Sequence, residues 1–159
     1  MRKFIQNKLK EQKGLTLIEL LAVIVILAII AAIAIPAIGN IIENSRNGAV
    51  KSDYQNALAA ANIYFTENPG ADGATVDVNV LAGTAADTTT SYLEDQGSLA
   101  DDVTITKAQA GNTIDGTATA NGTTYTVSGL TNSELGAIPN SDFNDEQDIT
   151  PAYAATFAD

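Results

Sequence analysis

The chain contains no cysteine, no histidine and no tryptophan among its 159 residues. Without cysteine, no disulfide can staple one segment of the chain to another. Without cysteine or histidine, the common pairings of a nucleophile with a base are missing, and no serine has an identifiable base nearby in the sequence. A glycine-rich phosphate-binding loop is also absent. We therefore expect no enzymatic activity.

Basic residues are scarce outside the first fourteen positions. Five of the eight lysines and arginines lie there: Arg2, Lys3, Lys8, Lys10 and Lys13. Residues 15–159 keep three basic and eighteen acidic side chains, a net side-chain charge of −15. Binding to nucleic acid depends on lysine and arginine contacts with phosphates. We therefore expect no direct binding of nucleic acid.

One long apolar run dominates what the sequence does contain. Residues 20–39 carry no charged and no polar side chain, and about 20 apolar residues suffice to cross a bilayer. Inside lipid the backbone must satisfy its own hydrogen bonds, which predicts a helix despite the many β-branched residues. The basic residues before the run predict that residues 1–14 face the cytoplasm and the remainder faces outward.

Glu19 stands at the start of this run, where an anionic side chain requires an explanation. A carboxylate at the centre of a bilayer costs about 2.5–3.5 kcal/mol even on lenient scales. A secretory signal peptide would have a shorter apolar region of about 7–15 residues. A plain membrane anchor fits the length of the run but gives Glu19 no role. Neither interpretation accounts for the whole segment.

Residues 13–21, Lys-Gly-Leu-Thr-Leu-Ile-Glu-Leu-Leu, followed by the apolar run and Pro36, closely resemble the N-terminus of type IV prepilins. The resemblance implies that a prepilin peptidase cuts after Gly14 and methylates the new amino group of Leu15. Glu19 becomes the fifth residue of the mature protein, the position that guides subunits into the filament in this family. The apolar helix would lie first in the cytoplasmic membrane and later in the filament core. A platform protein and a cytoplasmic ATPase would assemble the filament.

Physical chemistry supports this role for Glu19. Cleavage gives Leu15 a cationic amine, and Glu19 lies one helical turn away, where the helix N-terminus favours a negative charge. In a stack of identical helices, the amine of one subunit could reach Glu19 of its neighbour. Apolar contacts allow sliding, whereas a charge pair in a low dielectric fixes the axial register. Pro36 either kinks the helix or marks its exit from the membrane, and the helical pattern beyond it favours a kink.

Helical spacing continues beyond the apolar run as far as Asn68-Pro69-Gly70, which predicts the end of the helix. The apolar positions of this stretch are Ile38, Ile42, Val50, Tyr54, Ala57, Leu58, Ala61 and Phe65. We predict one helix over residues 15–67, about 80 Å long at 1.5 Å per residue. The domain organisation is then a leader at 1–14, a membrane or filament-core helix at 15–39, its amphipathic continuation at 40–68 and a β-domain at 69–159. We expect Tyr54, Tyr64 and Phe65 to pack in the core.

Beyond Gly70 the composition shifts to Thr, Ala, Gly, Asp and Asn, with alternating runs at 75–80, 103–107, 113–120 and 123–128 that predict strands. Asn121-Gly122 is typical of a two-residue hairpin turn, and Gly111-Asn112 predicts the preceding turn. The last three runs should form an antiparallel meander with one apolar face, and the helix over residues 50–65 should cover that face. The expected inward residues are Val103, Ile105, Ile114, Tyr125 and Val127. The fold class is α+β.

Oxygen-bearing residues alternate near the C-terminus: Asp142, Asn144, Glu146 and Asp148. An EF-hand loop requires glycine at its sixth position and glutamate at its twelfth. Gln147 and Tyr153 occupy those positions, so the EF-hand match fails. Two interpretations stay open, a looser calcium site and a solvated acidic loop. We expect no other cofactor.

Taken together, these features predict the major structural subunit of a type IV pilus-like filament on the cell surface. Such a homopolymer would serve surface motility, adhesion or DNA uptake. One alternative is a pseudopilin of a type II secretion or competence system. Another is a membrane-anchored extracellular binding protein that never polymerises.

Overall fold

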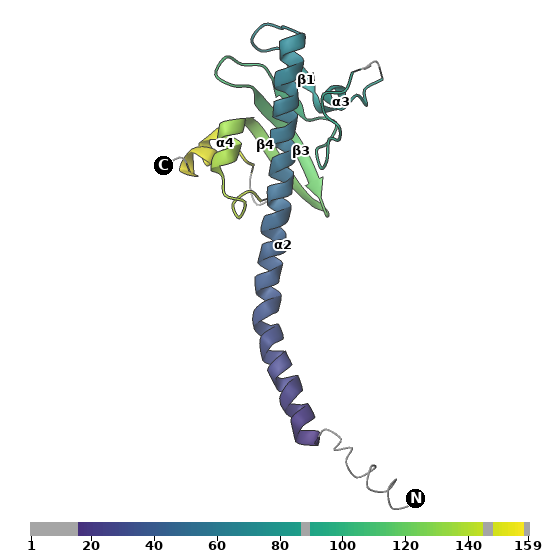
Figure 1. The fold of residues 1–159 in the computed structure, drawn as a ribbon. Helices are drawn as coiled ribbons and strands as arrows, with labels where there is room; N and C mark the ends of the chain where they lie inside the picture. The colour runs from purple at the N-terminus through teal and green to yellow at the C-terminus, as the bar shows by residue number, and fades with distance from the viewer. Residues whose placement is uncertain (1–15, 87–89, 145–147, 158–159) are drawn as a thin grey trace, which may run out of the picture. The chain divides into compact units, whose positions relative to one another are not determined.

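The computed structural model describes residues 16–86, 90–144 and 148–157 (Figure 1). The elements in chain order are α2 (Leu17–Glu67), β1 (Thr75–Asp77), α3 (Val78–Leu81), β2 (Thr104–Thr106), β3 (Thr113–Ala120), β4 (Thr123–Thr131), α4 (Asn132–Ala137), α5 (Pro151–Ala154) and a 3₁₀ turn, η1 (Ala155–Phe157). A long helix followed by an antiparallel sheet confirms the α+β class. The chain divides into two compact units, and the boundary in the sequence falls between Ile41 and Ile42.

The first unit contains α2 up to Ile41. Its large apolar side chains are all exposed, from 49% at Val25 to 84% at Leu17. By length and composition, α2 is able to cross a membrane. The helix continues through Pro36 without a break, which agrees with the predicted continuation of the helix beyond that residue. Whether Pro36 bends the helix stays a prediction.

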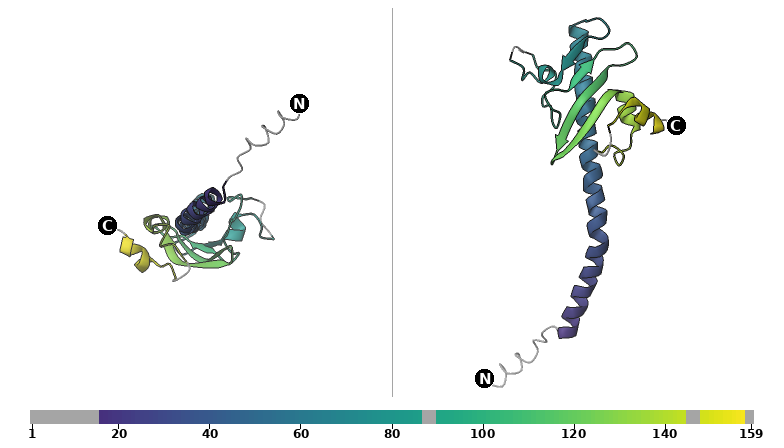
Figure 2. Two further views of the ribbon diagram at one scale, coloured as in Figure 1. Left: turned by 90° about the horizontal axis from the view of Figure 1, so that it is seen from below. Right: turned by 180° about the vertical axis from the view of Figure 1, so that it is seen from behind.

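The second unit contains the remainder of α2 and a sheet in the order β1-β2-β3-β4, in which every neighbouring pair is antiparallel. Figure 2 shows the sheet curving around one side of this part of α2. The predicted turn between β3 and β4 is confirmed, because Asn121 and Gly122 both have positive φ, 52° and 84°. The last three predicted runs therefore form the expected meander, and β1 adds a further strand at its edge.

The strand predicted over residues 75–80 is only partly correct. It ends at Asp77, and Val78–Leu81 form a helical turn instead. A helical turn places residues three apart on the same side, and Val78 and Leu81 are both fully buried. A continued strand would have turned one of them to the opposite face of the sheet. Burial of this pair therefore outweighs the β-propensity of the valines.

The core of the second unit lies between the sheet and α2. The predicted inward residues are all 0–2% exposed: Val103, Ile105, Ile114, Tyr125 and Val127. The helix contributes side chains that are 0–6% exposed: Val50, Tyr54, Ala57, Leu58, Ala60, Ala61 and Phe65. The predicted core role of Tyr54 and Phe65 is confirmed, and Tyr64 packs at the edge, partly buried. Ile42 remains 53% exposed.

The chain after β4 returns to this core, which the sequence pattern did not predict. Phe143 is fully buried and stacks on the Tyr125 ring, with the ring centroids 5.8 Å apart. It also meets the Tyr54 ring edge-on at 6.2 Å. Further along, Ile149 pairs with Val127 of β4 through a parallel bridge and is fully buried. The C-terminal segment thus completes the core that the meander alone leaves open.

Candidate functional site

Glu19 is positioned by a capping box at the start of α2. Its Oε2 accepts hydrogen bonds from the backbone N–H and the hydroxyl of Thr16, both at 2.7 Å. The Thr16 hydroxyl in turn accepts the backbone N–H of Glu19 at 3.3 Å. This reciprocal pattern satisfies two donors that the first helical turn would otherwise leave open. The carboxylate therefore has local partners within the single subunit.

Thr16 is a functional residue that the sequence reasoning missed. The signal was present, because Thr16-Leu17-Ile18-Glu19 has the Ser/Thr-x-x-Glu spacing of a capping box in front of an apolar run. The cap directs the carboxylate toward the N-terminal end of the helix. That is the end where a cationic amine would lie after cleavage.

The predicted processing residues, Gly14 and Leu15, lie outside the residues that the structure describes. The description begins at Thr16, directly after the expected new N-terminus. The expected cleavage and methylation therefore stay predictions. The expected cleavage site lies directly before a helix whose large apolar side chains, in residues 17–41, are exposed among the described residues.

The candidate calcium ligands are only partly described, because Glu146 lies outside the described ranges. Asp142 accepts a hydrogen bond from the Ser141 hydroxyl at 2.8 Å, and its backbone carbonyl accepts one from the Tyr153 hydroxyl at 2.9 Å. Within residues 16–86, 90–144 and 148–157, no three acidic side chains lie close enough to hold a metal ion. Calcium binding by Asp142, Asn144, Glu146 and Asp148 stays a prediction.

A polar clamp joins α2 to the segment after β4. Asn47 is 2% exposed, and its side-chain amide donates to the Asn140 carbonyl at 2.9 Å. The side-chain carbonyl oxygen of Asn47 accepts a hydrogen bond from the Tyr125 hydroxyl at 2.8 Å. A buried amide of this kind is stabilising only when its groups are paired, as they are here. No local pattern around Asn47 predicts this role, since asparagine within a helix is usually exposed.

The second unit has few cations, and two of them are engaged locally. The Lys51 ammonium donates to the Ile138 carbonyl at 2.9 Å, and partial burial lowers the pKa of Lys51. The Lys107 ammonium donates to the Gly70 carbonyl at 2.7 Å and lies 5.9 Å from the centroid of the Phe65 ring. Both lysines thus hold the fold together, and Arg46 is the remaining cation after residue 14.

Comparison with known proteins gives one finding. Residues 9–35 match the family model described as the prokaryotic N-terminal methylation motif. No significant match was found among curated proteins or among solved structures. The matched range contains Gly14, Leu15, the capping pair Thr16 and Glu19, and most of the exposed apolar helix. The N-terminal segment of the chain therefore carries the prokaryotic N-terminal methylation motif, the class III signal peptide of type IV pilins and pseudopilins.

Proposed function

We propose that this chain is the major structural subunit of a type IV pilus-like filament. The observation that carries the proposal is the division of apolar side chains between the two units. The second unit buries its core residues, whereas residues 17–41 expose every large apolar side chain. Exposed apolar surface on this scale requires either lipid or other protein chains. A filament subunit uses both in succession.

The proposed sequence of events begins in the cytoplasmic membrane, which holds the subunit by residues 20–39. Prepilin peptidase hydrolyses the peptide bond between Gly14 and Leu15, and the freed amine of Leu15 is then methylated. A platform protein and a cytoplasmic ATPase extract the subunit from the membrane. The apolar helices then bundle in the filament core and bury the surface that lipid covered before.

Glu19 has two partners in this scheme. Within the subunit it caps α2 through Thr16 at 2.7 Å. Its second carboxylate oxygen, Oε1, is not used in that capping box and can receive the cationic Leu15 amine of a neighbouring subunit. The attraction between two opposite charges is strong in a low dielectric and weakens when the partners separate. The pair therefore sets the axial register of helices whose apolar contacts alone would slide.

The proposal is tested by shearing filaments from whole cells and measuring the intact mass of their subunit. We expect long filaments whose subunit begins at Leu15 and carries one added methyl group. A Gly14→Val variant, which places a β-branched side chain at the cleaved bond, should keep its leader and form no filaments. A processed subunit found only in the membrane or in short fibres would contradict the proposal and favour a pseudopilin. An unprocessed subunit would favour a simple membrane anchor.

A further inference from the structure

Arg46 is a cation without a local partner in a strongly acidic chain. After the leader, three basic side chains stand against eighteen acidic ones. Lys51 and Lys107 are both engaged by backbone carbonyls. Among the described residues, Arg46 makes no hydrogen bond and has no carboxylate within 4.0 Å. An arginine guanidinium stays charged and favours planar, two-pronged contacts with carboxylates.

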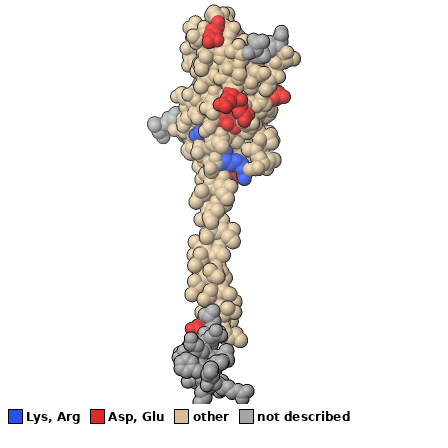
Figure 3. Space-filling view, turned by 45° about the vertical axis from the view of Figure 1, so that its right-hand side comes forward, with Lys and Arg blue, Asp and Glu red and all other residues tan. Residues whose placement is uncertain are grey.

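Glu94 is an exposed anion on another part of the same unit. It lines two surface pockets with Asp95, and Asp53 and Asp101 complete their acidic lining. Figure 3 shows a cluster of acidic side chains on one face of this unit.

The other three carboxylates of this acidic patch are already used. Asp53 accepts from the Ser98 N–H at 2.9 Å and the Ser98 hydroxyl at 2.6 Å. Asp95 accepts from the Gly97 N–H, and Asp101 from the Gln96 side chain, both at 2.9 Å. In the part of the chain that the structure describes, Glu94 makes no hydrogen bond or ion pair.

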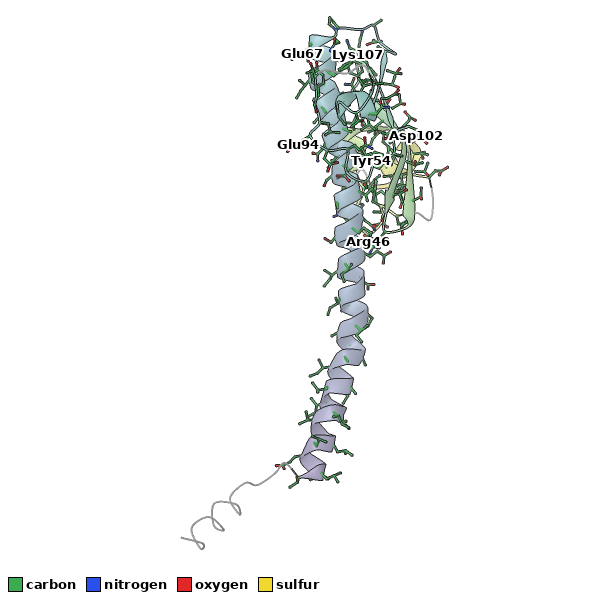
Figure 4. All side chains as sticks on the ribbon, turned by 90° about the vertical axis from the view of Figure 1, so that its right-hand side faces the viewer. Arg46, Tyr54, Glu67, Glu94, Asp102 and Lys107 are labelled. Atoms are coloured by element: carbon green, nitrogen blue, oxygen red, sulfur yellow. The ribbon has the colours of Figure 1, made fainter. Side chains whose placement is uncertain are left out.

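The two residues do not pair with each other in the part of the subunit that the structure describes. Glu94 lies beside Asp53 and Asn56 of α2, with which it lines a pocket. Arg46 precedes these two residues by seven and ten positions on the same helix, which is about 10–15 Å along the axis. Figure 4 shows Arg46 and Glu94 at different levels along α2. With the two residues at these levels, a salt bridge between them is better placed to join two copies of the chain than to form within one.

We propose that Arg46 of one subunit pairs with Glu94 of a neighbouring subunit in the filament. The inference rests on the proposed function, since it needs parallel copies displaced along the filament axis. The contact joins two different patches, so it is heterologous and repeats from copy to copy without closing on itself. It also places Arg46, the one basic side chain among the described residues without a local partner, against the acidic patch of the next subunit, which lowers the repulsion between chains of side-chain charge −15.

A charge-reversal cycle tests the pair in the full-length protein. Arg46→Glu and Glu94→Arg should each lower the yield of sheared filaments by about tenfold, because like charges then face each other. The double variant should restore the yield to within about twofold of the parent, since the pair is re-formed in reverse. Asp72→Arg is the matched control, because Asp72 is exposed and undergoes the same change of charge. Its yield should stay at the parental level.

Cysteine cross-linking gives an independent readout, because the parent chain contains no cysteine. Cells that produce an Arg46→Cys chain together with a Glu94→Cys chain should yield covalent dimers in their filaments after treatment with a bis-maleimide reagent. Neither chain alone should form them. The reagent spans the reach of an arginine–glutamate pair, whereas a direct disulfide would need Cα atoms about 4.4–6.8 Å apart.

The possible outcomes separate this inference from the proposed function. Failure of the parent to form filaments would overturn both. Normal filaments without cross-links, and without rescue in the double variant, would overturn only the Arg46–Glu94 pair. If Arg46→Glu alone lowers the yield and Glu94→Arg does not, Arg46 acts on another anion such as a lipid phosphate, and the pair is again overturned. Unchanged thermal unfolding of each variant confirms that the subunit itself is intact.

Discussion

The two parts of α2 contain similar apolar residues with opposite exposure. Ile29 in the first unit is 57% exposed, whereas Leu58 in the second is 2% exposed. The second part finds its apolar partner within the chain, in the inner face of the sheet. The first part has no such partner among the described residues of its own unit. Apolar content alone therefore does not distinguish a helix that stabilises a domain from one that waits for lipid or for other subunits.

The largest effect of a single substitution is expected at Glu19, in the first unit. The variant Glu19→Ala should reduce sheared filaments below detection, because removing one partner of a buried charge pair costs about 3–5 kcal/mol. Membrane insertion should persist, since the change makes the first unit more apolar. The control variant is Glu43→Ala, because Glu43 is an exposed acidic residue further along α2. This variant should assemble normally. Parental filament numbers from Glu19→Ala would remove the proposed role in register.

The next largest effect should come from matched truncations in the two units. Phe143→Ala removes a fully buried ring between Tyr54 and Tyr125, and should lower the free energy of unfolding by about 3–5 kcal/mol. Ile29→Ala removes an exposed side chain and should leave that free energy unchanged. Denaturant unfolding of the full chain in detergent, followed by near-ultraviolet circular dichroism, measures both. Equal losses would mean that residues 17–41 also contribute to the folded core.

A smaller effect is expected at the polar clamp. Asn47→Leu removes the acceptor of the Tyr125 hydroxyl and the donor to the Asn140 carbonyl. Loss of these buried hydrogen bonds should cost about 1–3 kcal/mol of unfolding free energy. Asn56→Leu makes the same change at an exposed position of α2, and should alter stability by no more than about 0.5 kcal/mol. The same unfolding assay compares them, and similar values for both would show that the clamp contributes nothing.

The smallest effect concerns Tyr54, which influences the pH dependence of the free energy of unfolding only above pH 10. Burial, with a contribution from the negative charge of Asp102, raises the pKa of Tyr54 well above its ordinary value of 10. Above pH 10 the unfolded chain loses this proton while the folded chain keeps it. Stability is therefore complete below pH 10 and falls by about 1.4 kcal/mol per pH unit above it. Tyr54→Phe should flatten that fall in unfolding curves recorded from pH 9 to 11, and an unchanged slope would rule out Tyr54 as its source.

Much of the second unit could be predicted from local sequence signals. Asn121-Gly122 specifies its turn because both residues tolerate positive φ, and Asn68-Pro69-Gly70 ends α2 just after Glu67. Alternation identified the inward residues of the meander. The prediction was wrong at Val78–Leu81, where alternation cannot show that tertiary burial selects a helical turn. The return of Phe143 and Ile149 to the core was missed because the residues they contact are distant in sequence.

The functional residues divide in the same way. The charge of Glu19 at the start of an apolar run marks it in the sequence, and the spacing from Thr16 contains the signal for its cap. The roles of Asn47, Lys51, Arg46 and Glu94 depend on which carbonyls and carboxylates lie beside them. Nothing local to those residues reports that.

The sequence by itself determined the leader, the apolar helix and the methylation motif, because hydropathy, charge order and short spacings act between residues close together in the chain. Only the tertiary structure decided which half of α2 is covered, that the segment after β4 completes the core, and which cation lacks a partner. Those outcomes depend on contacts between residues separated by as many as 93 positions, as in the hydrogen bond from Asn47 to Asn140. Such contacts form only when the whole second unit packs, because each one must offset the entropy of ordering the chain between its ends.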